Sequence, residues 1–471
     1  MVEFLGGDCL RDASCAYILG CPEESKNLDA TLHPDAFPTL LQQGLDVSRS
    51  LWDTRFLIAH LDIEYVNFDF PGEAYLHPQR IFSMQRPVVH AIQRLLLQWE
   101  IVPLHLLTGR GHHFVWKIDR NSDAFHQLKQ LGRISTTLEG RYQEPCAPRG
   151  LCVEHSLGQA FAGLGLLMEY LGHMAKHQVI GNSQLSVQLT DIEVGATGQS
   201  CCGREVISID LSEYADPLHK RHIRVPFSVY LKPFQNRNAV GEHVLAATPP
   251  IFEIPLFEMA EEEAIEVMRS AEETMELAGR ASVHIPEQSS GTQRLLEHYR
   301  QSSLKSFHDW FYQQDHHPPE HWRSTYDRCQ LDQLPSCTRH ILQHPNDLLL
   351  KPAGIQHLVR VFSALGWHPR HIAGLIRSKY ERDFNWGDRW YQRDAATRAD
   401  GYTRLFAGLI ATGVDDAVDL NCVSNREKGY CFEPECGHNL ADYRDSLRAR
   451  KDHERLGCRP FDGLFLPNQH F

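Results

Sequence analysis

The feature that most constrains this chain is an apolar run over residues 55–66, Arg-Phe-Leu-Ile-Ala-His-Leu-Asp-Ile-Glu-Tyr-Val, which predicts a β-strand that contains two acids. Residues 102–118 predict two partner strands joined by a glycine turn. Residues 185–194 and 205–211 predict another pair.

Helices with apolar spacing are expected between these strands, near 87–99 and 159–176, so the first half of the chain is expected to be an α+β domain. From about residue 331 the pattern is mostly helical. The run 258–278 predicts an acidic helix, and 283–292 predicts a linker. The expected divisions are an N-terminal extension, the α+β domain, an acidic helical linker and a helical C-terminal domain: 1–35, 36–250, 251–330 and 331–471.

The net charge of −13 does not exclude a nucleic-acid partner. Residues 1–50 hold eight acids and three bases, and residues 251–283 hold nine acids and two bases, so these two segments carry nearly all of it. Residues 351–410 hold ten bases and five acids. Because local charge governs phosphate binding, that segment remains compatible with DNA.

The 13 cysteines are expected to be free thiols or metal ligands. The chain starts without the basic segment and apolar core of a secretory signal, which favours a cytoplasmic location and argues against a disulfide framework. The longest uncharged apolar stretch, 156–168, is too short to cross a bilayer. No membrane partner is therefore expected.

Three acids stand at the ends of predicted strands. Asp62 and Glu64 are two residues apart, so period-two geometry points both carboxylates to one side. Asp210 ends the strand Val-Ile-Ser-Ile-Asp. Three hard oxygen donors suit two Mg²⁺ or Mn²⁺ ions. An ordinary solvated acidic pair is the alternative interpretation.

Two segments suit a bound triphosphate. In 108–113, Thr-Gly-Arg-Gly-His-His, glycines let backbone amides approach an anion while the arginine and imidazole add charge-assisted donors. An ordinary hairpin turn is the alternative. In Arg-Val-Pro-Phe-Ser-Val-Tyr-Leu-Lys, residues Arg224, Ser228 and Lys232 alternate, so on a strand they would share a face and line phosphates.

Taken in this order, these segments resemble the archaeo-eukaryotic primase superfamily, most closely the catalytic small subunit of eukaryotic and archaeal primase. Asp62-Ile-Glu64 is similar to that family's first acidic motif, and Asp210 falls on its third metal ligand. Residues 108–113 resemble its Ser-Gly-Arg-Gly-x-His phosphate motif. Residues 224–232 are similar to its basic-x-Pro-Phe-Ser-Val-His-x-Lys segment. The resemblance covers 54–235 well and 331–463 more loosely.

The resemblance implies an RRM-like mixed sheet and a DNA primase-polymerase that makes and extends primers on single-stranded DNA with two Mg²⁺ or Mn²⁺ ions. The expected partners are the template, an RNA or DNA primer, and NTPs or dNTPs. Catalysis and metal binding would fall to Asp62, Glu64 and Asp210. Nucleotide binding would fall to Thr108, Arg110, His113, Arg224, Ser228, Tyr230 and Lys232. Tyr230 stands where the family usually has histidine.

The C-terminal third resembles the iron–sulfur domain of the large primase subunit, through Leu-Pro-Ser-Cys at 334–337 and Gly-Cys-Arg-Pro-Phe at 457–461. A [4Fe–4S] cluster takes four thiolates. The set implied here is Cys337, Cys422, Cys431 and Cys458, with Cys436 as the rival for a middle place. The alternative is structural zinc on the last four cysteines or with His438.

The small subunit's zinc knuckle is missing between the first two motifs. Cys146, Cys152 and His155, with Cys201 or Cys202, are an alternative zinc set. Both subunits' features in one chain would make a fused single-chain primase-polymerase. Two other functions remain open: a metal-dependent nuclease or phosphohydrolase, and a catalytically silent nucleic-acid-binding replication protein.

Overall fold

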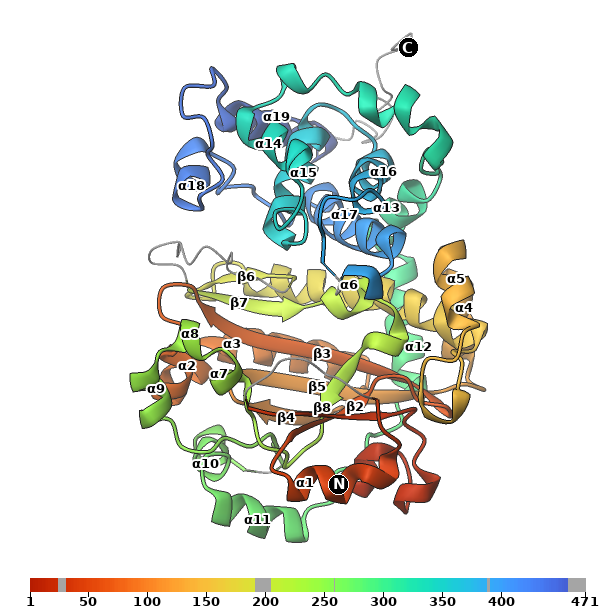
Figure 1. Ribbon diagram of the computed structural model, residues 1–471, viewed down its shortest axis with the longest axis vertical. Coiled ribbons are helices and arrows are strands. Elements are labelled where there is room, and N and C mark those ends of the chain that lie inside the picture. Colours follow the sequence, from red (N-terminus) through yellow and green to blue (C-terminus); the bar gives the residue numbers. More distant parts are fainter. Residues whose placement is uncertain (24–30, 191–204, 258, 388–389, 456–471) are drawn as a thin grey trace. The chain divides into compact units, whose positions relative to one another are not determined.

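The structure is a computed structural model that describes the chain except for residues 24–30, 191–204, 258, 388–389 and 456–471 (Figure 1). The chain divides into two compact units, and each is described here by itself. Unit 1 comprises Met1–Thr190 and Gly203–His298, and unit 2 continues from Tyr299. The division falls inside helix α12 (Ser289–Arg300). The N-terminal residues 1–23 and the segment 259–298 therefore belong to the same unit as the predicted strands.

Unit 1 is an α+β unit with two sheets. The larger has six strands in the order β6-β7-β3-β5-β4-β9, and the smaller has three in the order β1-β2-β8. The only parallel pair among these named strands is β6 with β7. The strands are β1 (Ile18–Cys21), β2 (Asp46–Ser50), β3 (Phe56–Asn67), β4 (Leu104–Thr108), β5 (Gly111–Asp119), β6 (Ser186–Gln188), β7 (Glu205–Asp210), β8 (His222–Arg224) and β9 (Ile254–Pro255).

The helices of unit 1 before the small-sheet strand β8 include the two that cover the large sheet. They are α1 (Phe37–Gln42), α2 (Glu73–Leu76), α3 (Pro78–Gln98), α4 (Asp123–Leu131), α5 (Thr136–Tyr142) and α6 (His155–Val179). Helices α3 and α6 pack against each other and against β3. Leu61 and Ile63 of β3 are fully buried, which accounts for the apolar run that predicted this strand.

The later helices of unit 1 are short. They are α7 (Lys232–Gln235), α8 (Arg237–Val240), α9 (Glu242–Ala247), α10 (Glu261–Val267) and α11 (Ala271–Arg280). The helical character expected over the acidic run 258–278 is confirmed, and it is divided between α10 and α11. Ser270 explains the break, because its side chain accepts a hydrogen bond from the N–H of Glu273 and so caps a new helix.

Two other expected boundaries differ. The helix predicted to begin at Pro87 begins at Pro78, where a proline at the first helical position lacks only an N–H that would be unbonded anyway. Pro87 lies within that helix. The linker predicted over 283–292 is docked on the sheet instead, because the Trp116 indole donates to Thr292 Oγ1 at 3.1 Å and α12 already begins at Ser289.

The described elements of unit 2 are helices, as its periodicity predicted. They are α13 (Ser303–Phe311), α14 (Ser336–Gln343), α15 (Pro352–Ala364), α16 (Pro369–Tyr380), α17 (Ala395–Ala411), α18 (Cys422–Glu427) and α19 (Leu440–Arg455). Prolines open α15 and α16, and Asp394 caps α17 by accepting from the N–H of Thr397 at 2.8 Å. Within the described residues, no helix combines the length and apolar character needed to span a bilayer.

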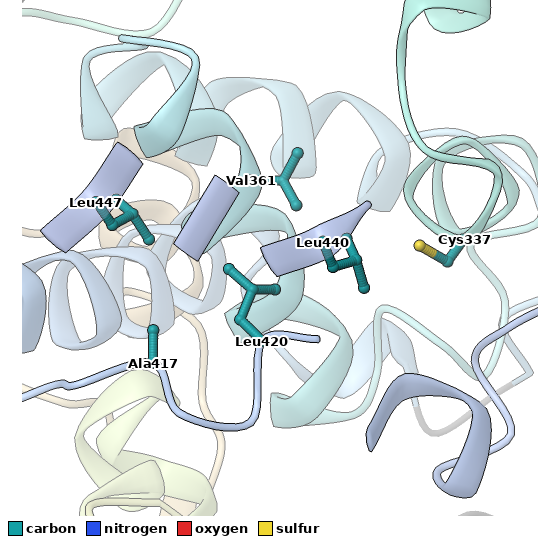
Figure 2. Packing of buried hydrophobic residues seen from close by; sticks show 6 residues of the cluster. All are labelled: Cys337, Val361, Ala417, Leu420, Leu440 and Leu447. Carbon is teal, nitrogen blue, oxygen red and sulfur yellow. The ribbon is translucent and has the colours of Figure 1, made fainter. Parts of the chain in front are cut away.

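A buried apolar cluster joins the beginning of unit 2 to its end. Figure 2 shows it: Cys337, Val361, Ala417, Leu420, Leu440 and Leu447. Partly buried residues, among them Cys422 and Tyr443, pack against it. The cluster thus brings α14, α15 and α19 together with the segment before α18, and it places two of the predicted ligand cysteines at one core.

Candidate functional site

The centre of the six-stranded sheet carries the predicted acids. β3 pairs antiparallel with β5 and with β7, and Asp62 lies directly opposite His113 on one side and Asp210 on the other. Directly opposed residues project from the same face, as do residues two apart along one strand. Asp62, Glu64, His113 and Asp210 therefore share one face, as the alternation predicted for the two acids of β3.

Glu64 is held by two cations from separate segments. Lys232 Nζ lies 2.7 Å from Glu64 Oε1, and Arg110, from the turn between β4 and β5, donates to Oε2. Burial alone would raise the pKa of Glu64, but the charges of Arg110 and Lys232 outweigh it and hold the pKa well below its usual range. Glu64 is therefore ionised at neutral pH, and it ties the turn and α7 to β3.

His113 lies between two carboxylates. Its Nε2 is 3.4 Å from Asp62 Oδ1, and its Nδ1 is 3.4 Å from Glu253 Oε1. Glu253 is completely buried. Burial lowers the pKa of His113, but Glu253 and Asp62 together raise it to about 10. The ring is therefore an imidazolium at neutral pH with a proton on each nitrogen.

Arg224 links this histidine to the small sheet. Its Nε and Nη2 donate to the two carboxylate oxygens of Asp46 on β2, at 2.6 and 2.8 Å, and its Nη1 is 3.6 Å from Glu253 Oε2. The guanidinium also lies 4.4 Å from the ring centroid of Tyr230. Burial lowers the pKa of Arg224, but Asp46 raises it above its usual value. This bidentate fork fixes the guanidinium against β2.

The expectation that Arg224, Ser228 and Lys232 share one strand face is wrong. β8 ends at Arg224, and the N–H of Ser228 closes a turn with a 3.0 Å hydrogen bond to the carbonyl three residues earlier. Pro226 has no N–H to give a neighbouring strand, and Phe227 has a left-handed φ of 69°. Lys232 begins α7 instead.

Three of the predicted nucleotide contacts are buried. Ser228 is fully buried, and its Oγ accepts a hydrogen bond from the N–H of Val47 at 2.7 Å. Thr108 is buried at the end of β4. Tyr230 is buried as well, and a Cβ at Gly109 would lie 2.5 Å from its ring. These buried side chains therefore have a structural role: they pack beneath the 108–113 turn and against the neighbouring segments.

The second glycine of the motif is required by the sheet. A Cβ at Gly111 would lie 1.8 Å from the carbonyl oxygen of Ile63 on β3, so no larger residue fits at this position. The carbonyl of Arg110 accepts hydrogen bonds from Tyr65 N at 3.1 Å and Gln85 Nε2 at 3.2 Å. These contacts fix the turn and position the Arg110 side chain beside Glu64.

Asp46 and Glu253 complete the site, and sequence reasoning missed both. Glu253 stands in the apolar segment Pro-Pro-Ile-Phe-Glu-Ile-Pro-Leu, and an acid inside such a run is a signal that a buried partner exists. Asp46 follows Gly-Leu at the start of a five-residue strand and carries no comparable signal. Its importance comes from β2 pairing with β8, which joins segments about 180 residues apart.

The donor set of this face suits a hard divalent cation. Asp62 and Asp210 oppose each other; the buried Asp62 Oδ1 has the imidazolium of His113 3.4 Å away, and Asp210 Oδ1 accepts from Ser212 N at 2.8 Å. Glu64 is engaged by its two cations. As the side chains are placed, no group of three or more His, Cys, Asp or Glu in the described part of the chain is arranged around a metal position.

Three cysteines of unit 2 converge. The thiols of Cys422 and Cys436 both point at the carbonyl oxygen of His438, each at 4.0 Å. Burial, with a smaller contribution from the nearby Cys436 and Cys422, raises the pKa of Cys337 to about 11. The convergence includes Cys436, the rival of Cys431 for a middle place among the predicted ligands. Cys458, the predicted last ligand, lies outside the described residues.

The alternative zinc set of unit 1 is only partly within the described residues. Cys146 and Cys152 lie near each other, and burial together with Cys152 raises the pKa of Cys146. His155 Nδ1 is 3.2 Å from Glu139 Oε1. Cys201 and Cys202 lie outside the described part of the chain.

Charged side chains from several segments of unit 1 thus form two connected sets on one face. One set runs from Asp46 through Arg224, Glu253 and His113 to Asp62, and the other consists of Glu64 with its two cations. No family model, curated protein or solved structure matches the chain.

Proposed function

We propose that this protein is a template-directed nucleotidyltransferase, a DNA primase-polymerase that synthesises and extends primers on single-stranded DNA. The observation that carries the proposal is Glu64 held between Arg110 and Lys232, on the same sheet face as the opposed Asp62 and Asp210. A nucleoside triphosphate with its divalent ions brings both signs of charge. Such a complex matches a face that offers carboxylates to cations and basic groups to phosphates.

The carboxylates would hold the ions. Asp62 and Asp210 offer hard oxygens from adjacent strands, and Glu64 is the third donor from the same face. Two Mg²⁺ or Mn²⁺ ions bound there would supply an activated hydroxyl nucleophile and a stabilised leaving group. Residues of the hairpin turn and α7 would exchange their contact with Glu64 for contact with phosphate oxygens.

The cations would bind and orient the triphosphate. Arg110 presents a planar fork, and Lys232 presents a point charge. His113 adds donors on both ring nitrogens. In the proposed reaction the primer 3′-hydroxyl attacks the α-phosphorus, a new P–O bond forms, and the bond to pyrophosphate breaks. Arg224 would support the site indirectly, because Asp46 fixes its guanidinium beside Glu253 and Tyr230.

For unit 2 we propose a [4Fe–4S] cluster, with Zn²⁺ as the alternative occupant. Cys422 and Cys436 share the carbonyl of His438 and Cys337 lies near both, which favours these three as proposed ligands, with Cys458 as the proposed fourth. Cys431, the middle ligand that the resemblance implied, becomes the less favoured candidate. A helical unit closed by such a cluster would hold the template or the 5′ end of the primer.

The test is an extension assay with the full chain. The protein is incubated with single-stranded template, Mn²⁺ or Mg²⁺, and labelled NTPs or dNTPs, with and without a primer, and the products are separated on a gel. Products longer than the primer, together with new primers in its absence, are expected. A matched Asp62→Asn protein supplies the inactive control.

The same gel separates the rival functions. Shortening of the template or primer by the wild-type protein, with no extension, would replace the proposal by a nuclease. Template binding without extension or cleavage would replace it by a silent DNA-binding protein. Extension that survives in Asp62→Asn would move the chemistry to another part of the chain.

A further inference from the structure

A second charged site lies at the opposite end of β3 from Glu64. It is a cleft of about 600 Å³, formed by the start of β3, the end of β5, α4 and the first turn of α6. Its lining includes Arg55, Phe56, Arg120, Lys129 and Asp119. None of these residues belongs to the candidate active site, and all of them lie in unit 1.

The cleft has an excess of positive charge that the surrounding protein leaves uncompensated. Arg55, Arg120 and Lys129 line it against a single carboxylate, Asp119. That carboxylate accepts hydrogen bonds from the backbone and side-chain amide of Asn121, at 2.8 and 3.2 Å. Among the described residues, neither the Arg55 guanidinium nor the Lys129 ammonium has an ion-pair partner. Two cations therefore remain to bind an anion.

The third cation is partly occupied. Arg120 donates to both carboxylate oxygens of Glu154, at 3.1 Å from Nη1 to Oε1 and through a second contact from Nη2 to Oε2. The side chain of Glu154 is 62% exposed, so the pair is loosely fixed and easily screened. Glu154 is also the residue before α6, a helix of 25 residues whose N-terminal end carries partial positive charge. An anion in the cleft would compete with Glu154 for Arg120.

Two aromatic residues line the cleft, and of these Phe125 is buried while Phe56 offers the partly exposed ring. Lys117 Nζ lies 4.4 Å from the ring centroid of Phe56, and the guanidinium of Arg120 lies 5.8 Å from that of Phe125. Phe56 is partly exposed. Basic side chains interleaved with aromatic rings bind single-stranded nucleic acid, because phosphates meet cations while bases find a flat apolar surface.

We propose that this cleft binds the sugar–phosphate backbone of the single-stranded template, an assignment that rests on the proposed polymerase function. Phe56 and Asp62 are six residues apart on one strand, which separates the cleft from the carboxylates by roughly 20 Å. A single-stranded template that reaches from the cleft to the carboxylates would be bound at both places. The cleft is therefore a phosphate-positioning site that adds affinity without touching the reacting atoms.

The test measures DNA binding by fluorescence anisotropy with the full chain and labelled oligo(dT) of increasing length. The variants are Arg55→Ala/Lys129→Ala, Glu154→Gln, and Arg280→Ala as a matched control on the exposed end of α11. The double variant should bind long oligo(dT) about tenfold or more weakly, and the slope of log affinity against log salt should fall by about 1.4, since each phosphate contact on a single strand contributes about 0.7. Glu154→Gln frees Arg120 and should tighten binding about two- to fivefold.

Length separates the cleft from the active site. Wild-type affinity should rise steeply once the oligonucleotide is long enough to span the roughly 20 Å separation, and this rise should be absent in the double variant. Unchanged binding of long oligo(dT) in the double variant, while the wild type still extends primers, would overturn the cleft assignment alone. A wild-type protein that binds oligo(dT) through the cleft yet extends nothing would overturn the proposed polymerase function.

Discussion

The candidate active site of unit 1 and the cysteine group of unit 2 are built in opposite ways. In unit 1, four carboxylates and four cations from separate segments pair with one another, and these pairings keep Glu64, His113 and Arg224 charged although burial opposes their charges. In unit 2, Cys337 belongs to an apolar cluster and Cys422 packs against it, and burial raises the pKa of Cys337 to about 11. The first site is organised by its own charges, whereas the thiols of the second would become thiolates only on binding the proposed metal.

This difference predicts that the two sites respond differently to the substitution of one of their side chains. Removing one charge from unit 1 leaves a buried partner of opposite sign, so the effect depends on which charge is lost and how deeply its partner is buried. Removing one thiol from unit 2 would abolish the proposed metal site, because that site depends on all of its ligands. The predictions below compare these two responses.

The largest effect should come from the acids of the sheet face. Asp62→Ala or Asp210→Ala should lower primer extension by about 10³-fold or more, because the metals supply several kcal/mol of transition-state stabilisation. Template binding should be unchanged. Gel extension assays and anisotropy measure the two, with Glu276→Ala on exposed α11 as the control. Full extension in either variant would refute the assignment of these acids.

The next effect is loss of the metal from unit 2. After anaerobic purification, the wild type should contain iron and absorb near 400 nm, roughly where thiolate-bound clusters absorb. Cys337→Ser or Cys436→Ser should lose most of the iron and should impair primer initiation more than extension. Cys431→Ser is the matched control and should retain both. One zinc per chain without iron would establish the zinc alternative, and iron lost only from Cys431→Ser would restore the original ligand set.

Arg224→Ala should destabilise unit 1 by about 3–5 kcal/mol. The substitution leaves Asp46 and Glu253 as buried carboxylates without their guanidinium, and Glu253 is completely inaccessible to solvent. Thermal unfolding, compared with exposed Arg280→Ala, measures the effect. An unchanged midpoint with a large loss of nucleotide affinity would instead assign Arg224 to the triphosphate alone.

Arg110→Ala should weaken nucleotide use with little loss of stability. Losing a charge-assisted contact to phosphate is worth about 1.5–3 kcal/mol, or about 10- to 150-fold in kcat/KM. Glu64 keeps Lys232 as a partner, so no buried charge is stranded. Arg86→Ala, which removes another arginine paired with a glutamate on unit 1, is the control. Kinetics within twofold of wild type would mean that the triphosphate is held elsewhere.

The sequence predicted the three acids of this site but not all of the charged residues that surround them. Period-two alternation placed Asp62 and Glu64 on one face, and the end of the next acidic strand supplied Asp210 opposite Asp62. These relations are local to a strand and its neighbours. Asp46 was missed because its role depends on the pairing of β2 with β8, which brings together segments about 180 residues apart.

The same limit explains the misplaced strand after β8. Alternation of Arg224, Ser228 and Lys232 predicted a strand, but Pro226 and the left-handed Phe227 turn the chain within three residues. In unit 2, helical periodicity predicted α15, α16 and α17 closely, because the amphipathic spacing of a helix is a property of its own segment. Which cysteines meet is set by packing between helices, and spacing alone left that choice open.

The smallest predicted effect concerns the buried histidines of unit 2. Burial lowers the pKa of His368 and of His371 to about 4, with neighbouring histidine and Arg370 charges acting in the same direction. Both pKa values lie below the ordinary value of about 6.5, so the unfolded chain binds more protons between pH 6.5 and 4. Their contribution to stability is therefore complete above pH 6.5 and declines as the pH falls toward 4.

His113 of unit 1 acts in the other direction, because its pKa is raised to about 10 and its contribution declines as the pH rises toward that value. His371→Gln should remove a slope of at most about 1.4 kcal/mol per pH unit between pH 6.5 and 4, and should leave the alkaline limb unchanged. Denaturant unfolding at several pH values measures both limbs, with exposed His284→Gln as the control. An acid limb identical to that of wild type would show that His371 is protonated in the folded unit, where it stacks on His317 with ring centroids 4.8 Å apart.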